Sequence, residues 1–76
     1  WRAATFDPLY ADAWTIAGLS LADLRLDRLA LAAFDVAEGK DPMRSWPVFA
    51  RAQLLRRRGQ ARESLRILEA WLARHP

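Results

Sequence analysis

The chain has 76 residues, 53% of them hydrophobic, and a formal net charge of +3 at neutral pH. A chain of this length forms at most one small domain, and its hydrophobic core is of marginal size. The absence of cysteine excludes disulfides and thiolate metal sites, and the charges that interrupt every apolar stretch exclude a membrane span.

The first predicted helix begins after Asp7-Pro8, because an aspartate can cap free helix N–H groups and a proline presets φ for the first turn. We expect this helix to run from about residue 9 or 11 to residue 23. Its apolar face is formed by residues that recur at helical spacing, namely Trp14, Ala17, Gly18 and Leu21.

The second predicted helix begins near Asp27, a capping residue, and runs to about residue 38. Gly39 follows it and is well suited to end the helix in a left-handed conformation. The apolar side of this helix holds Ala30, Leu31, Phe34 and Ala37.

The third predicted helix begins at Ser45, with Pro47 in its first turn, and runs to about residue 57, before Gly59. Its inner side holds Val48, Ala52 and Leu55. The fourth predicted helix covers about residues 61–74. Its apolar stripe consists of Leu65, Leu68, Trp71 and Leu72.

A spacing of 34 residues relates the two halves of the chain. Three prolines lie 34 residues apart, at Pro8, Pro42 and Pro76. Each directly follows an acidic or polar residue that ends an apolar run. Without insertion or deletion, the spacing aligns Ala11 with Ser45, Gly18 with Ala52, Leu21 with Leu55, Ala30 with Ser64, Leu31 with Leu65, and Phe34 with Leu68. A fixed spacing of this size indicates a solenoid of repeated units. The aligned small residues Gly18 and Ala52 are expected to let the partner helix approach closely.

The 34-residue unit resembles the tetratricopeptide repeat, with its pattern W-x₂-L-G-x₂-Y, then A-x₃-F, then P. The first unit matches at Trp14, Gly18, Ala30, Phe34 and Pro42, and departs at Ala17 and Leu21. The second unit keeps Leu55, Gly59, Ser64, Leu68 and Pro76, and departs at Val48, Arg51 and Ala52. The resemblance therefore covers essentially the whole chain.

This resemblance implies an all-α fold of helix–turn–helix repeats in a right-handed superhelix, a fragment of a tetratricopeptide-like solenoid. It divides the chain into residues 1–8, the end of a preceding repeat helix, residues 9–42, the first repeat, and residues 43–76, the second. Members of the family are interaction scaffolds without catalysis of their own. We therefore expect a protein-interaction or assembly function, no enzyme activity and no cofactor, with the cytoplasm as the favoured location.

In this family the first helix of each repeat lines a concave groove that binds peptides. The resemblance implies that the groove residues here are Asp12, Thr15, Leu19, Ala22 and Asp23, then Trp46, Phe49, Gln53, Arg56 and Arg57. Two aromatic rings beside guanidinium groups suit a peptide with an apolar side chain and a carboxylate. Alternatively, Trp46 and Phe49 pack against neighbouring turns. The chain has no Asn and a single Lys, Lys40, so the Lys/Asn clamp of chaperone-binding members is excluded.

The apolar stripe of the last helix predicts self-association. Trp71 stands where the family has a small alanine, so the face of Leu65, Leu68, Trp71 and Leu72 is expected to meet another copy. Residues 1–42 carry a net charge of −3 and residues 43–76 a net charge of +6. This asymmetry favours head-to-tail association or an acidic partner. Alternatively, the charges simply lie on two solvated faces.

Other functions have a weaker basis in the sequence. The only histidine, His75, lies at a helix end without a neighbouring nucleophile, and neither a metal-ligand cluster nor a glycine-rich phosphate loop is present. The arginines of the second unit support RNA binding as an alternative: Arg56, Arg57, Arg58, Arg62 and Arg66. We rank this below protein binding because the first unit is acidic. A third alternative is a purely structural segment of a larger repeat protein.

Overall fold

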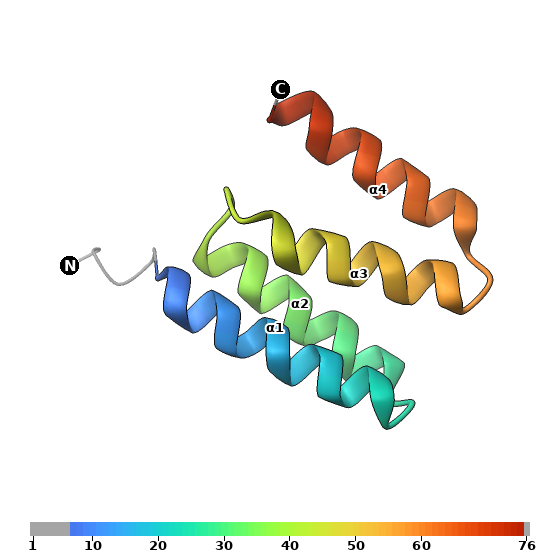
Figure 1. The fold of residues 1–76 in the computed structure, drawn as a ribbon, viewed down its shortest axis with the longest axis horizontal. Coiled ribbons are helices and arrows are strands. Elements are labelled where there is room, and N and C mark those ends of the chain that lie inside the picture. The colour runs from blue at the N-terminus through green and yellow to red at the C-terminus, as the bar shows by residue number, and fades with distance from the viewer. Residues whose placement is uncertain (1–6, 76) are drawn as a thin grey trace.

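The computed structural model describes residues 7–75, which form four α-helices and no strand within that range. The helices are α1 (Pro8–Asp23), α2 (Asp27–Lys40), α3 (Ser45–Arg57) and α4 (Ala61–Arg74). Helices α1 and α2 form a first antiparallel hairpin, and α3 and α4 form a second (Figure 1). The predicted all-α class and the predicted positions of the four helices are confirmed.

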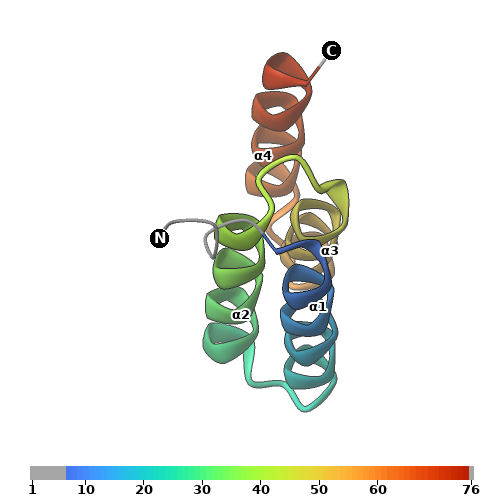
Figure 2. The same cartoon turned by 90° about the vertical axis from the view of Figure 1, so that its left-hand side faces the viewer.

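Helix α3 belongs to the second hairpin and also packs against the first. It contacts both α1 and α2, whereas α4 packs mainly against α3. Figure 2 shows α3 above α1, with α2 beside them and α4 at the far end of the array. The first hairpin is therefore covered by a third helix, while α4 is packed on one side only. Most of the predicted stub, residues 1–8, lies outside the described residues, and so does Pro76.

The helix starts agree only in part with the predicted caps. Asp7 caps α1, because its Oδ1 accepts a hydrogen bond of 3.1 Å from the Tyr10 N–H. Asp27 and Ser45 do not cap, since each is already the first residue of its helix and no side chain caps α2 or α3. The prediction for Gly39 is also wrong. This glycine lies within α2 and has no left-handed φ.

The turns within the two hairpins have the same backbone structure. In the first, the N–H of Leu26 donates to the carbonyl of Leu21 at 2.9 Å. In the second, Gln60 donates to Leu55 at 2.8 Å, and both residues lie 34 positions later. The left-handed residue is Arg25, with φ 66°, in the first turn and Gly59, with φ 85°, in the second. We call residues 34 positions apart counterparts, because their backbone positions correspond.

The main hydrophobic cluster lies where α3 meets the first hairpin, and its buried members are Ala22, Ala30, Phe34, Ala50 and Leu54. Gly18 allows the close approach within that hairpin. A Cβ added to Gly18 would lie 2.7 Å from Cδ1 of Phe34 and closer still to Cε1. The predicted close packing at Gly18 is therefore confirmed, because the fully buried ring of Phe34 occupies the space that a side chain would need.

The buried side of α1 differs from the predicted one. Its buried residues are Ala11, Thr15, Gly18 and Ala22. Ala17, which was expected inside, is exposed. Thr15 and Ala22 were expected in the groove, and the structure contradicts this for both, because α2 and α3 pack over their side of α1. The Thr15 hydroxyl donates to the Ala11 carbonyl at 2.9 Å, so it is satisfied in the core.

Candidate functional site

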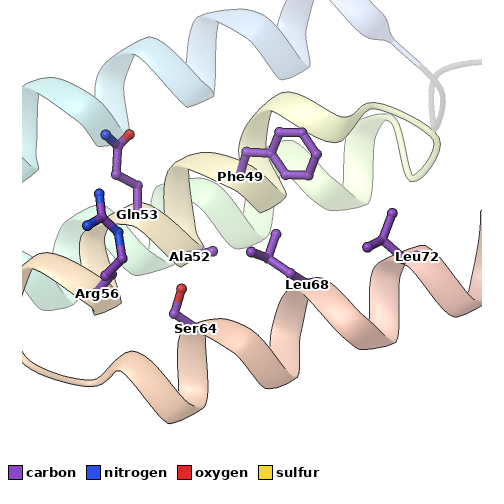
Figure 3. Close-up of a pocket in the computed structure, with 7 residues that line it drawn as sticks. All are labelled: Phe49, Ala52, Gln53, Arg56, Ser64, Leu68 and Leu72. Carbon is purple, nitrogen blue, oxygen red and sulfur yellow. The ribbon is translucent and has the colours of Figure 1, made fainter.

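A hollow of about 430 Å³ opens between α3 and α4 (Figure 3). Three of its lining residues carry polar groups, and the others are apolar. The lining residues are Phe49, Ala52, Gln53 and Arg56 from α3, and Ser64, Leu68 and Leu72 from α4. Gln53 and Arg56 lie at one end and Phe49 and Leu72 at the other. The hollow is thus polar and basic at one end and apolar at the other.

Side-chain size explains why the second hairpin is hollow. In the first, the ring of Phe34 fills the space against Gly18. Their counterparts are Leu68, which is shorter than phenylalanine and only half-buried, and Ala52. No aromatic ring therefore fills the corresponding space between α3 and α4.

Aromatic side chains border the apolar end of the hollow. Trp71 meets Phe49 edge to face, with ring centroids 5.8 Å apart. Its indole also stacks on the His75 ring at 4.2 Å. The counterpart of Trp71 is Ala37, which is fully buried. The bulky indole thus braces α4 against α3 where the first hairpin has only a methyl group.

The hollow brings together residues from two separately predicted surfaces. Phe49, Gln53 and Arg56 come from the predicted groove, and Leu68 and Leu72 come from the predicted self-association face. The remaining members of that face lie outside the lining. Trp71 packs against Phe49 as described, and Leu65 is exposed on α4.

The other predicted groove residues do not join the hollow. Trp46 and Arg57 are exposed on α3, and Asp23 is exposed on α1. Leu19 is partly buried against the core cluster. Asp12 lies half-buried where α1 meets α3 and is bound by an arginine, so a single continuous groove along α1 and α3 is not formed by these side chains.

Three arginine–carboxylate pairs bind α3 and the residues directly before and after it to the first hairpin. Arg44 donates two hydrogen bonds to Asp12, at 3.0 and 2.7 Å. Two further pairs have the same two-bonded form: Arg51 with Glu38, and Arg58 with Asp27. These bonds hold the pKa values of Asp12 and Asp27 below the usual range and raise those of Arg44 and Arg58.

Sequence reasoning missed these pairs. Their members lie 13 to 32 residues apart, so no local spacing connects them. Two arginines proposed for RNA binding are also engaged, because Arg58 binds Asp27 and Arg66 binds Glu63 at 3.2 Å. Arg56 forms no ion pair with any carboxylate among residues 7–75 and leaves the hollow with an unneutralised cation.

The described part of the chain also bears on membrane and metal sites. Across residues 7–75, every helix is too short or too polar to span a bilayer. Among the same residues, no three His, Asp or Glu side chains come together in a way that would hold a metal ion.

Comparisons with protein-family models, with curated proteins and with solved structures find no match for this chain. The resemblance to the tetratricopeptide repeat therefore stays a prediction from the 34-residue pattern.

Proposed function

We propose that the chain is a protein-interaction module of tetratricopeptide type, in which two repeats stack as a segment of a right-handed superhelix. It binds a helix of a partner protein in the hollow between α3 and α4. One observation carries this proposal: the hollow is the counterpart of the surface on which α3 itself packs. A fold of this kind does not by itself establish a function, so the proposal rests on that surface.

The correspondence holds residue by residue. In the core cluster, α3 packs against Ala22, Ala30 and Phe34 of the first hairpin. Their counterparts are Arg56, Ser64 and Leu68, and all three line the hollow. A helix that approached the second hairpin as α3 approaches the first would lie directly over these side chains.

The contacts of α3 define the shape of a suitable ligand helix. Ala50 and Leu54 are buried in the cluster and lie one helical turn apart. A helix with uncharged side chains at these two places, four positions apart, therefore suits the hollow. An acidic side chain beside Arg56 would add a charge-assisted hydrogen bond.

The charges of this ligand must differ from those of α3. The three carboxylates that bind the arginines of α3 and its flanks are Asp12, Asp27 and Glu38. Their counterparts are Trp46, Ala61 and Leu72, which are apolar and exposed. A helix carrying the three arginines would lose their partners at the hollow, so an apolar helix is favoured.

A peptide of residues 43–58 that carries Arg44→Tyr, Arg51→Ala and Arg58→Leu tests the proposal. It keeps the small residue and the leucine of α3 and removes the three arginines. Titration of the chain should shift the NMR methyl signals of Leu68 and Leu72, with an affinity at least about tenfold above that of the unmodified peptide, a difference of ~1.4 kcal/mol.

The matched control is the chain with Leu72→Glu, which places a charge at the exposed apolar end of the hollow. This variant should bind the modified peptide at least about tenfold more weakly. Absence of binding by both peptides, or signal shifts that avoid α4, would contradict a helix-binding role.

A further inference from the structure

Helix α1 has an uncovered face on the side opposite to its buried residues. This outer face of α1 consists of Leu24, directly after the helix, and five helix residues, all of them exposed: Tyr10, Ala13, Ile16, Ala17 and Ser20. At 100° per residue, these positions lie across the helix from Ala11, Thr15, Gly18 and Ala22. None of the six carries a charge, although outward-facing helix positions are usually polar.

The outer face of α1 is the counterpart of the face that α3 presents to the first hairpin. Ile16 corresponds to Ala50 and Ser20 to Leu54, the two residues of α3 in the core cluster. At the positions of Arg44, Arg51 and Arg58, the outer face has Tyr10, Ala17 and Leu24. The helix thus lacks the three arginines and presents its larger residue first, with Ile16 where α3 has Ala50 and Ser20 where α3 has Leu54.

The changes on the outer face of α1 match those at the hollow. Where α3 meets the first hairpin, three arginines face three carboxylates. The six counterparts of these residues, on the outer face of α1 and on the second hairpin, are all uncharged. The counterparts of the arginines are Tyr10, Ala17 and Leu24, and the counterparts of the carboxylates are Trp46, Leu72 and Ala61. A change on one surface alone would leave buried unpaired charges, whereas a joint change keeps the two surfaces complementary.

We infer that the occupant of the hollow is α1 of a second copy of this chain, docked head to tail. This inference rests on the proposed function, since it names the partner of the same hollow. Tyr10 of one copy then lies against Trp46 of the other, and Ala17 of the first lies against Leu72 of the second. Ile16, 54% exposed in the single chain, is covered by the hollow.

Charge supports the same orientation. Residues 1–42, which include the docking α1, carry a net charge of −3, and residues 43–76, which include the hollow, carry +6. Head-to-tail contact brings the acidic half of one copy to the basic half of the next, which speeds encounter and disfavours head-to-head contact. Because the two surfaces differ, the contact is heterologous, and repeated contacts give rings or open filaments.

Two variants, each blocking one surface, test this geometry. Ile16→Glu blocks the outer face of α1, and Leu72→Glu blocks the hollow, where Leu72 is 56% exposed. The unaltered chain should sediment as concentration-dependent oligomers. Each variant alone should be monomeric, with its self-affinity lowered at least about tenfold. An equimolar mixture should form a 1:1 dimer that grows no further, because each copy retains one intact surface.

Leu29→Glu is the matched control, since Leu29 is exposed on α2 and its counterpart is already Glu63. This variant should assemble like the unaltered chain. If circular dichroism shows that a blocking variant is unfolded, Ala17→Glu and Ala61→Glu replace the pair, because both positions are exposed within helices.

The outcomes separate the two proposals. A chain that is monomeric at millimolar concentration, or an Ile16→Glu variant that still assembles, overturns head-to-tail docking. If the modified peptide of residues 43–58 nevertheless binds the hollow, the proposed function survives and the partner is a different protein. If oligomers form but the mixture of blocking variants does not pair, the contact is between like surfaces and the inference is wrong.

Discussion

Phe34 in the first hairpin and Leu68 in the second occupy corresponding positions, but only Phe34 is fully buried. Thr15 is likewise fully buried, whereas its counterpart Phe49 is 47% exposed at the edge of the hollow. The two turns have the same backbone hydrogen bonds, so the difference in burial does not come from the turns. It comes from α3, which covers the first hairpin, while none of the residues 7–75 covers the second.

The comparison shows how one helical unit can be closed off as a core or left open as a surface hollow. In the first hairpin, small residues and an aromatic ring are closed off by α3. In the second, a shorter side chain at Leu68 and polar groups at Gln53 and Arg56 leave an open, partly basic surface. The following predictions alter one hairpin at a time to break or sharpen this contrast.

Truncation of the corresponding residues Phe34 and Leu68 should have the largest effect. Phe34→Ala removes a fully buried ring and should lower the free energy of unfolding by about 3–5 kcal/mol. Leu68→Ala should cost about 1–2 kcal/mol, because the side chain already borders open space. Urea unfolding followed by circular dichroism measures both. Equal losses would show that the second hairpin is as tightly packed as the first.

Two glycine substitutions should act in opposite directions. Gly18→Ala places a Cβ against the Phe34 ring, and overpacking of this kind costs about 1–3 kcal/mol, more than the helix propensity gained. Gly39→Ala, in α2 with nothing within 4 Å, should stabilise the chain by about 0.5–1 kcal/mol. Thermal melts of the two variants give the comparison. If Gly18→Ala stabilised the chain, the close approach of the Phe34 ring would not be the reason for a glycine at this position.

The two turns allow an exchange of their left-handed residues. Arg25 has φ 66° without being glycine, so Arg25→Gly should relieve strain and raise stability by up to about 1 kcal/mol. Gly59→Ala should lower stability by about 1 kcal/mol, because alanine is strained at φ 85°. Chemical denaturation of both variants tests whether the turns are equivalent. If both variants changed the stability in the same direction, the two turns would not be equivalent.

Acidification should weaken the contact between the hairpins, with the smallest effect of the four. Arg44 and Arg58 lower the pKa values of Asp12 and Asp27 in the folded state, so the ionised carboxylates stabilise it. This contribution is complete above the unfolded pKa of about 3.9 and is lost as the pH falls through the lowered folded pKa. Asp12→Asn combined with Asp27→Asn should remove it.

The measurement is the free energy of unfolding from about pH 7 down to about pH 2. The difference between the unaltered chain and the double variant should be largest near neutral pH and shrink below about pH 4. A constant difference across this range would mean that the carboxylates act through packing and not through their charges.

The sequence by itself determined the secondary structure of this protein. Asp7 before α1, Pro8 at its first position, Gly59 before α4 and the helical spacing of apolar residues are local signals, and helix formation depends on local backbone preferences. The 34-residue spacing likewise predicted Gly18 as the site of close approach. The local capping signals were wrong at Gly39, Asp27 and Ser45, where a helix boundary lies one or two residues from the predicted one.

Only the tertiary structure decided which side of each helix is buried. Helix α1 is rich in small and apolar residues all around, so its periodicity did not distinguish the Thr15 side from the Ala17 side. Packing of α2 and α3 buried the first and left the second exposed. The arginine–carboxylate pairs and the joining of Phe49 with Leu68 around one hollow also required the fold, because each unites residues that are distant in the chain. Local preferences act within a few residues, whereas burial and charge pairing depend on which helices meet.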